Sequence, residues 1–207
     1  MKIERFVLGP VGTNCYIVRN EERGECFLVD LAACPPDLVS HIKNAGLTVK
    51  AVLLTHGHFD HIMGLDDFTE AFPVPVYAHE EEKGLLESAQ LNSSASMYGR
   101  GYTFSRAEYL KDGEEKEIAG IRIRTIYTPG HTIGGCCYYL PDEGVLFSGD
   151  TLFQASVGRT DLPTGSMGQL VRSIREKLFV LPEETKVCPG HMGETTIAYE
   201  KKYNPFL

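Results

Sequence analysis

The side chains in this sequence best suited to chemistry are histidines and aspartates that gather in short turn motifs. Three of the seven histidines fall within six residues, in Thr55-His56-Gly57-His58-Phe59-Asp60-His61. Two more end the similar segments Thr128-Pro129-Gly130-His131 and Cys188-Pro189-Gly190-His191, and an aspartate ends Phe147-Ser148-Gly149-Asp150. Packing gives no reason to place three histidines and an aspartate in one turn, whereas binding a metal ion does. The pattern therefore predicts a metal site.

Imidazole nitrogen and carboxylate oxygen are ligands of a borderline cation such as Zn²⁺, which imidazole binds at ~2.0–2.1 Å. His56 and His58 stand two residues apart, so an extended turn can present both to one ion, and Asp60 with His61 would lie beside a second position. One four-coordinate ion cannot use five histidines and two aspartates. Two cations ~3.5–4 Å apart can share a carboxylate and hold a hydroxide at neutral pH. The predicted ligands are His56, His58, Asp60, His61, His131, Asp150 and His191.

The predicted ligands follow predicted strands, which would present them together at one edge of a sheet. Proline and glycine turn the chain sharply where the strands before His131 and His191 end. Short apolar and β-branched runs predict strands over Lys2–Leu8, Cys15–Arg19, Glu25–Asp30, Val49–Thr55, Val74–Ala78, Glu117–Ile118, Ile121–Tyr127, Cys136–Leu140, Val145–Ser148 and Thr185–Cys188. Helical periodicity predicts helices over Pro36–Ala45, Ile62–Phe72, Glu80–Ser88 and Ser166–Leu178, and one that starts near Thr195.

A group of strands followed by a helix occurs twice, which predicts two sheets face to face with helices outside. The expected fold class is α/β, as a four-layer αββα sandwich in a single domain over residues 1–207. The segment Gln90–Ser105 shows no period and is long for a connection, which is typical of functional or mobile loops. His41, on a predicted helix, and His79, beside an acidic helix, are assigned no role in the site.

Composition excludes several classes of protein. The chain has 207 residues, a formal net charge of −8 and no block of Lys and Arg, so nucleic-acid binding is not expected. Apolar runs such as Ala51–Leu54 are far shorter than the ~20 residues of a membrane span. The charged N-terminus, Met1–Phe6, lacks the apolar region of a secretion signal, which predicts a cytoplasmic protein. The six cysteines form no C-x-x-C pair, so we expect reduced and mostly buried thiols, with a few exposed.

Taken in order, four motifs resemble those of the metallo-β-lactamase-fold hydrolases. They are T-H-x-H-x-D-H at 55–61, P-G-H-T-x-G at 129–134, S-G-D-T-L-F at 148–153 and P-G-H at 189–191. Gly149–Phe153 together with Gly158-Arg159-Thr160-Asp161 is similar to the glyoxalase II branch, particularly its short bacterial members. The resemblance implies the αββα fold and a division of the ligands. His56, His58 and His131 would form a first metal site, Asp60, His61 and His191 a second, and Asp150 would bridge them.

The resemblance also implies an activity. In glyoxalase II a hydroxide held by two metals attacks a thioester carbonyl and gives a hydroxy acid and a thiol. The implied substrate is a small-molecule thioester such as an S-acylglutathione or a related acyl-thiol, with Asp60 and Asp150 as catalytic carboxylates. The implied cofactors are two divalent metal ions, zinc first, with iron or manganese as alternatives. The C-terminal helical domain of longer glyoxalase II enzymes, which supplies glutathione contacts, is not expected, because sixteen residues follow His191.

Arg159 stands where this family places a basic substrate-binding residue, and it could hold a substrate carboxylate by a bidentate contact. A structural ion pair with Asp161 is the alternative role. The position therefore leaves two roles open, one in substrate binding and one in holding the loop.

Other activities compete with thioester hydrolysis. Persulfide dioxygenases share this fold and the G-R-T-D motif, and they use one iron held by two His and one Asp. In this chain those ligands would be His56, His131 and Asp150, with open positions for O₂ and substrate. The complete second ligand set favours hydrolysis. A β-lactamase fits the residues around Asp150 less well than a thioesterase does, a non-catalytic regulator would be expected to lack ligands, and Cys188 is expected to fill a buried strand end rather than act as a nucleophile.

Overall fold

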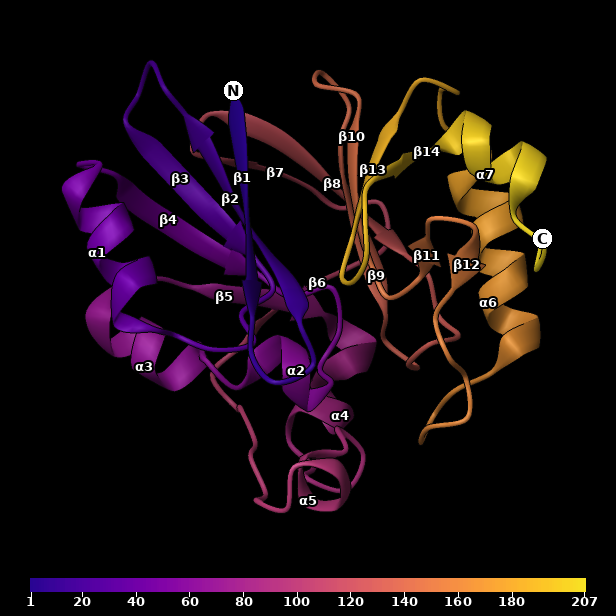
Figure 1. The fold of residues 1–207 in the computed structure, drawn as a ribbon, viewed down its shortest axis with the longest axis horizontal. Helices are drawn as coiled ribbons and strands as arrows, with labels where there is room; N and C mark the ends of the chain where they lie inside the picture. Colours follow the sequence, from indigo (N-terminus) through magenta and orange to yellow (C-terminus); the bar gives the residue numbers. More distant parts are fainter.

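Two six-stranded sheets face each other in the computed structural model, which describes residues 1–207 (Figure 1). The first sheet contains β1 (Lys2–Leu8), β2 (Thr13–Asn20), β3 (Glu25–Val29), β4 (Thr48–Leu53), β5 (Val76–His79) and β6 (Glu108–Leu110), in that order. The second contains β7 (Glu115–Ile118), β8 (Ile121–Tyr127), β9 (Cys136–Leu140), β10 (Val145–Gly149), β13 (Lys186–Pro189) and β14 (Thr195–Thr196). Its order is β14-β13-β10-β9-β8-β7, and β11 (Leu152–Phe153) pairs with β12 (Ser156–Val157) in a separate ribbon.

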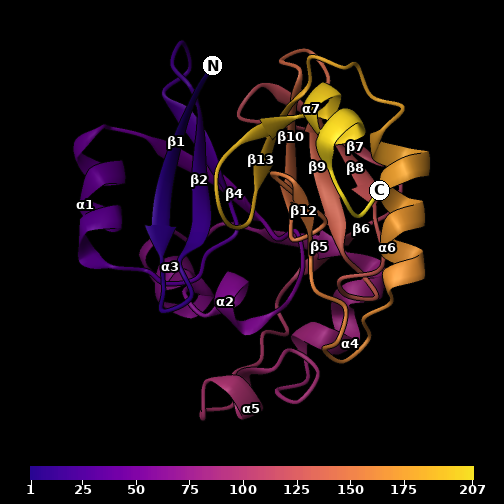
Figure 2. The same ribbon diagram turned by 45° about the vertical axis from the view of Figure 1, so that its right-hand side comes forward.

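Helices cover the outer face of each sheet. The first half contains α1 (Pro36–Asn44), α2 (Phe59–Ile62), α3 (Leu65–Ala71), a 3₁₀ turn at Glu80–Glu82, α4 (Lys83–Leu86) and α5 (Ser94–Met97). The second half contains α6 (Met167–Ser173), which continues as a π-helical turn at Ile174–Leu178, and α7 (Ile197–Tyr203). Figure 2 shows α1 outside the first sheet, α6 and α7 outside the second, and α5 projecting beyond the sheet ends. The predicted four-layer αββα arrangement is confirmed.

The core consists of three layers of apolar side chains, because the central strands are buried on both faces. Along β2, Tyr16 and Val18 pack between the two sheets, while Cys15 and Ile17 pack toward the helices of the first half. The third layer joins the outer face of the second sheet to its helices through Leu170, Ile174 and Ile197. These layers hold the strand ends in place, and the strand ends carry the predicted ligands.

The structure corrects several predicted elements. The helix predicted over Ile62–Phe72 is shorter, because α3 begins at Leu65, after Gly64, and the predicted first residue Ile62 ends the separate helix α2. The backbone of Gly64 lies so close to that of Ala33 that a Cβ atom there would lie 2.5 Å from the Ala33 carbonyl carbon. The segment Gln90–Ser105 contains α5, and β6, β11, β12 and β14 had no predicted counterpart. The helix predicted to start near Thr195 begins at Ile197.

The expectation that a few cysteines would be exposed is wrong. Five of the six are buried and Cys34 is half-buried. The buried thiols lie on β2, β3, β9 and β13, strands that are covered on both faces, so their positions follow from the layered core. The structure contains no helix with the length and hydropathy needed to cross a membrane.

Candidate metal centre

Seven predicted ligands lie at one edge of the paired sheets because the strands that precede them run in compatible directions. β4 is parallel to β3 and β5, and β10 is parallel to β13, so the segments that follow these strands leave from the same ends. His56 and His58 follow β4, and Asp60 and His61 lie in α2. The turns after β8, β10 and β13 supply His131, Asp150 and His191, respectively.

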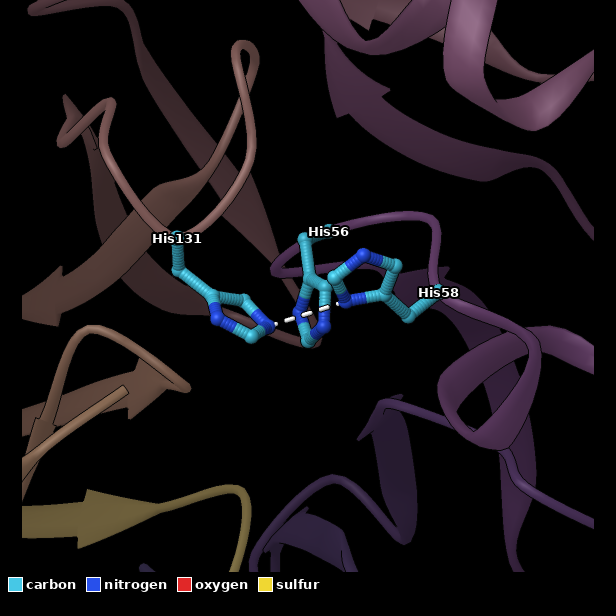
Figure 3. A group of neighbouring side chains, drawn as sticks. All are labelled: His56, His58 and His131. Atoms are coloured by element: carbon cyan, nitrogen blue, oxygen red, sulfur yellow. Dashed lines mark hydrogen bonds between the residues drawn. The ribbon is translucent and has the colours of Figure 1, made fainter. Parts of the chain in front are cut away.

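The first group of side chains is His56, His58 and His131. Their candidate ligand atoms all lie within 4.8 Å of one another, and the three side chains are buried. Figure 3 shows His131 entering from the second half of the chain to meet the other two rings, which come from the turn after β4. His58 Nδ1 lies 2.9 Å from His131 Nε2, and these two rings stand at 85° to each other. The group matches the predicted first site.

The second group is Asp60, His61 and His191, whose candidate ligand atoms also lie within 4.8 Å of one another. Asp60 Oδ2 is 3.3 Å from His191 Nε2 and 3.7 Å from His61 Nε2. His61 is fully buried, whereas His191 is half-buried and reaches the surface. The structure therefore also brings together the residues predicted for the second site.

Asp150 lies against both groups. Its Oδ1 atom is 3.4 Å from His61 Nε2, and its Oδ2 atom is 3.6 Å from His131 Nε2 and 3.5 Å from His191 Nε2. The carboxylate thus faces one nitrogen of the first group and two nitrogens of the second. This is the position that a carboxylate shared by two cations would occupy.

The nitrogen atoms that point away from the centre have partners that fix the rings. His61 Nδ1 donates to Asp30 Oδ2 at 2.9 Å, and His131 Nδ1 donates to the carbonyl oxygen of Arg159 at 2.7 Å. These bonds leave the Nε2 atom of each ring facing the centre. Asp30 also accepts from the Thr55 backbone N–H and hydroxyl group, so it connects β3 to the start of the histidine turn.

The His191 turn is positioned by the first sheet, across the interface between the two halves. The Asn14 side-chain amide donates to the carbonyl oxygens of Pro189 and Met192, at 2.9 and 3.0 Å. The Tyr16 hydroxyl donates to the Pro189 carbonyl oxygen at 2.8 Å. No sequence motif points to a site role for Asp30, Asn14 or Tyr16. An aspartate directly after the apolar run Cys26–Val29 was the available signal for the first of them.

The site fits cations because several of its buried polar atoms have no other partner. His56 Nε2, His61 Nε2 and Asp150 Oδ1 are buried and make no hydrogen bond. A buried polar atom without a partner costs about 1–3 kcal/mol, so several in one cluster call for a bound group. Two imidazole nitrogens 2.9 Å apart, as in His58 and His131, also require either a proton between them or a cation that takes both lone pairs.

Burial and neighbouring charges set the protonation states in the first group. Burial, followed by the neighbouring imidazoles, lowers the pKa of His56, and the same causes lower the pKa of His58 to about 3. Burial also lowers the pKa of His131, although Asp150 opposes the shift. These three rings are therefore neutral at pH 7 and carry the lone pairs that a cation requires.

In the second group and Asp150, neighbouring groups of opposite charge outweigh burial in setting the pKa values. Burial alone would raise the pKa of Asp150, but His61, His131 and His191 together hold it below its usual value. Burial alone would lower the pKa of His61, but Asp30, Asp150 and Asp60 hold it well above its usual value. Asp150 is therefore a carboxylate at neutral pH. The proton on His61 Nε2 would be released when a cation binds to that nitrogen.

Comparison with known proteins agrees with this geometry. Residues 8–191 match the Metallo-beta-lactamase superfamily. The chain belongs to this superfamily. Its relatives there include the "Probable metallo-hydrolase YqgX" of Bacillus subtilis, 41% identical over all of this chain and 98% of the relative. The hydroxyacylglutathione hydrolase GloC of Haemophilus influenzae is 32% identical over all of this chain and 98% of the relative.

Two solved structures of the superfamily are similar over nearly the whole chain. BLEG-1, a B3 metallo-beta-lactamase, superposes with a TM-score of 0.93 at 40% identity, covering 99% of each chain. TTHA1623, solved in a di-iron-bound form, superposes with a TM-score of 0.87 at 36% identity, covering 99% of this chain and 100% of that one. The protein is a metallo-hydrolase of the metallo-β-lactamase superfamily, and its His and Asp groups form a metal-binding site.

A cavity of about 340 Å³ opens above the two groups in this superfamily member. Five of the predicted ligands line it, together with apolar side chains from several segments. Val11, Met97 and Met192 are each at least half exposed at its walls, at 51%, 52% and 60%. The exposed fraction shows that these residues form an open apolar rim rather than part of the core.

Arg159 also lines this cavity, as its predicted role in substrate binding requires. Its guanidinium makes a bidentate ion pair with Asp161, with both N–O distances at 2.7 Å, and both side chains are exposed. The structure therefore places Arg159 beside the site and also forms the alternative pairing. Since the carbonyl of the same residue holds His131, its backbone is tied to the first group. His41 and His79 lie in neither group.

Proposed function

We propose that this metallo-hydrolase hydrolyses small-molecule thioesters, with an S-acylglutathione or a related acyl-thiol as substrate. The observation that carries the proposal is the placement of Asp150 between two histidine groups beneath an open cavity. The similarity to GloC, a hydroxyacylglutathione hydrolase, supports the substrate class. We further propose that a single domain over residues 1–207 carries the whole site and that the protein acts in the cytoplasm.

The proposed cofactors are two divalent cations. His56, His58 and His131 would hold the first, Asp60, His61 and His191 the second, and Asp150 would contact both. When bound, such cations supply a hydroxide at neutral pH and polarise the substrate carbonyl. Zinc suits the mixed imidazole and carboxylate set, and the di-iron form of TTHA1623 supports iron as the alternative. Manganese would also suit these ligand types.

The chain's own side chains orient and charge the site. Asp60 and Asp150 contribute negative charge, and Asp60 accepts a hydrogen bond from the Thr13 hydroxyl at 3.3 Å, which holds it toward the centre. The apolar rim, including Val11 and Met192, displaces water from a bound substrate and strengthens the electrostatic interactions beneath it.

The scarcity of hydrogen-bond donors in the cavity lining bears on which leaving group the site can release. Apart from the predicted ligands, Ser156 and Arg159 are the only side chains in its lining that carry a hydrogen-bond donor. An amine leaving group requires a proton to depart, and an alkoxide is a much poorer leaving group than a thiolate, because a thiol has a pKa of only ~8.5. This favours thioesters over amides. A cysteine nucleophile is disfavoured, because no cysteine lines the cavity and burial raises the pKa of Cys188 to about 12.

Thiol release tests this function. Metal-loaded protein is expected to hydrolyse acyl-thioesters in the absence of O₂, with thiol and acid formed in equal amounts. The measurement follows thiol release colorimetrically, in parallel with O₂ uptake on a persulfide substrate. O₂ consumption with no thioester turnover would contradict the proposal and support the dioxygenase alternative, in which His56, His131 and Asp150 hold one iron.

Arg159 is proposed to bind an anionic portion of the substrate. Arg159→Ala is expected to raise KM for anionic thioesters by about tenfold or more, because a charge-assisted hydrogen bond is lost. Asp161→Ala is expected to lower the same KM, since the carboxylate that now pairs with Arg159 would no longer compete. Neutral thioesters and metal content should change little. Steady-state kinetics on a matched anionic and neutral pair checks this.

The same two variants distinguish the structural role. If the ion pair between Arg159 and Asp161 only holds the loop, both variants should raise KM equally for anionic and neutral substrates. Both should also lower the melting temperature. Opposite changes in KM for the two variants cannot arise from a lost structural pair, so their direction decides between the roles.

A further inference from the structure

Glu82 is a buried carboxylate that lies close to the metal centre but does not face it. Glu82 ends the 3₁₀ turn Glu80–Glu82 and is fully buried. Its Oε1 atom accepts a hydrogen bond from the Gly57 backbone N–H at 2.8 Å. Its Oε2 atom accepts from the Gly134 backbone N–H at 2.7 Å and from the Thr132 hydroxyl at 3.1 Å. All the donors come from two short turns.

Those two turns carry the first histidine group. Gly57 stands between His56 and His58, and Thr132 follows His131 directly. The turns come from different halves of the molecule, one after β4 and one after β8. One carboxylate therefore connects the backbone positions that present all three histidines drawn in Figure 3.

The packing around Glu82 leaves no room for a looser connection. A Cβ atom on Gly134 would overlap both the Glu82 backbone and its carboxylate, so the turn approaches as closely as glycine allows. Burial raises the pKa of Glu82 to about 7, although its three hydrogen bonds oppose the shift. Apolar side chains of similar volume generally fill a core at least as well as buried charges do. The position therefore calls for a role beyond packing.

We propose that Glu82 is a positioning residue for the first metal group. By holding the His56–His58 turn against the turn that carries His131, it brings the three imidazoles together before a cation binds. The inference rests on the proposed assignment of these three histidines as one ligand set. It does not depend on which substrate the protein hydrolyses.

The chain provides a matched control in Glu200, on α7. Glu200 is also fully buried and also accepts hydrogen bonds from three residues. Its donors are the Ala155 backbone N–H at 3.0 Å, the Thr195 hydroxyl at 2.6 Å and the Asn204 side-chain amide at 2.8 Å. None of these residues belongs to a turn that presents a predicted ligand. Replacing either glutamate by glutamine exchanges one acceptor oxygen for an amide nitrogen and leaves the side-chain volume nearly unchanged.

The experiment titrates metal-free wild type, Glu82→Gln and Glu200→Gln with Zn²⁺ against a chromophoric chelator. It also records the absorption spectrum of each protein loaded with Co²⁺. Glu82→Gln is expected to bind one of the two cations about tenfold more weakly and to change the Co²⁺ spectrum. Glu200→Gln is expected to match wild type in both measurements, even where its melting temperature falls. Thr132→Val removes one hydrogen-bond donor to Glu82 and should produce a smaller change in the same direction. It replaces Glu82→Gln as the test variant if Glu82→Gln does not fold.

Two outcomes would overturn the inference, and they differ. Cation affinities and spectra that are unchanged in Glu82→Gln and Thr132→Val would leave Glu82 with a structural role only. A wild-type chain that binds neither Zn²⁺ nor Co²⁺ would remove the ligand assignment itself. Failure to hydrolyse thioesters, by contrast, would affect only the proposed function, because no substrate enters these measurements.

Discussion

Asp150→Ala is expected to lower kcat for hydrolysis by more than about 100-fold, which exceeds the effect of losing a typical outer-shell partner of a metal ligand. It should also reduce bound metal to below about one ion per chain. The reason is geometric, because Asp150 lies within 3.6 Å of nitrogens in both histidine groups. Without it, the negative charge that both cations would share is lost, and the two groups lose their common contact.

His191→Ala provides the comparison for this prediction. His191 belongs to the second group only, so this variant should keep about one ion per chain and more residual activity than Asp150→Ala. Asp142→Ala is the surface control. Asp142 forms an ion pair with Arg122, at an N–O distance of 2.6 Å, and lies in neither metal group. This variant should behave as wild type. Elemental analysis and kcat measured on the same samples test the order. Equal metal content and equal rates in Asp150→Ala and His191→Ala would contradict a shared contact.

Removing metal is the second change with a large expected effect. Protein purified without added metal should approach about two ions per chain, and a chelator should lower its midpoint of thermal unfolding by about 10 °C or more. A ligand at 1,000 times its dissociation constant stabilises the folded state by about 4 kcal/mol, and each kcal/mol is worth about 2–4 °C in a chain of this length. The metal-free protein keeps buried atoms such as His56 Nε2 and His61 Nε2 without partners.

Calorimetry before and after chelation measures this shift, and re-addition of Zn²⁺ should reverse it. His191→Ala should show a smaller shift, because one of its two groups is already incomplete. A stoichiometry that stays near one with full activity retained would contradict the two-cation site and favour a single iron.

The layered fold could be predicted because its signals are local. Continuous apolar runs such as Val49–Thr55 indicate strands that are covered on both faces, and the structure covers them. The later start of the helix predicted over Ile62–Phe72 could not be foreseen, because Gly64, which precedes α3, packs against the backbone of Ala33, a contact between distant residues. Helical periodicity alone does not report such a contact.

The site, too, combines residues with a local sequence signal and residues placed by contacts between distant segments. The turn motifs led to the six residues of the two groups and to Asp150, since His and Asp at strand ends are visible in the sequence. Glu82 sits in the acidic run Glu80–Glu82, which looks like a solvated helix face, and only the fold shows that its third member is fully buried. Asn14 meets the His191 turn from 175 residues away in the chain. Supporting contacts of this kind depend on which segments the topology brings together.

Much of the cavity rim resides on segments that carry no predicted ligand. The metal groups stand at strand ends braced by two sheets, while Val11 projects from an exposed turn and Met97 from the short helix α5. Substitutions at the rim remove little core packing, whereas substitutions at the strand ends disturb buried hydrogen bonds. Evolution can therefore exchange the loops of such a protein, and with them its substrate preference, while one reactive centre passes unchanged from ancestor to descendant.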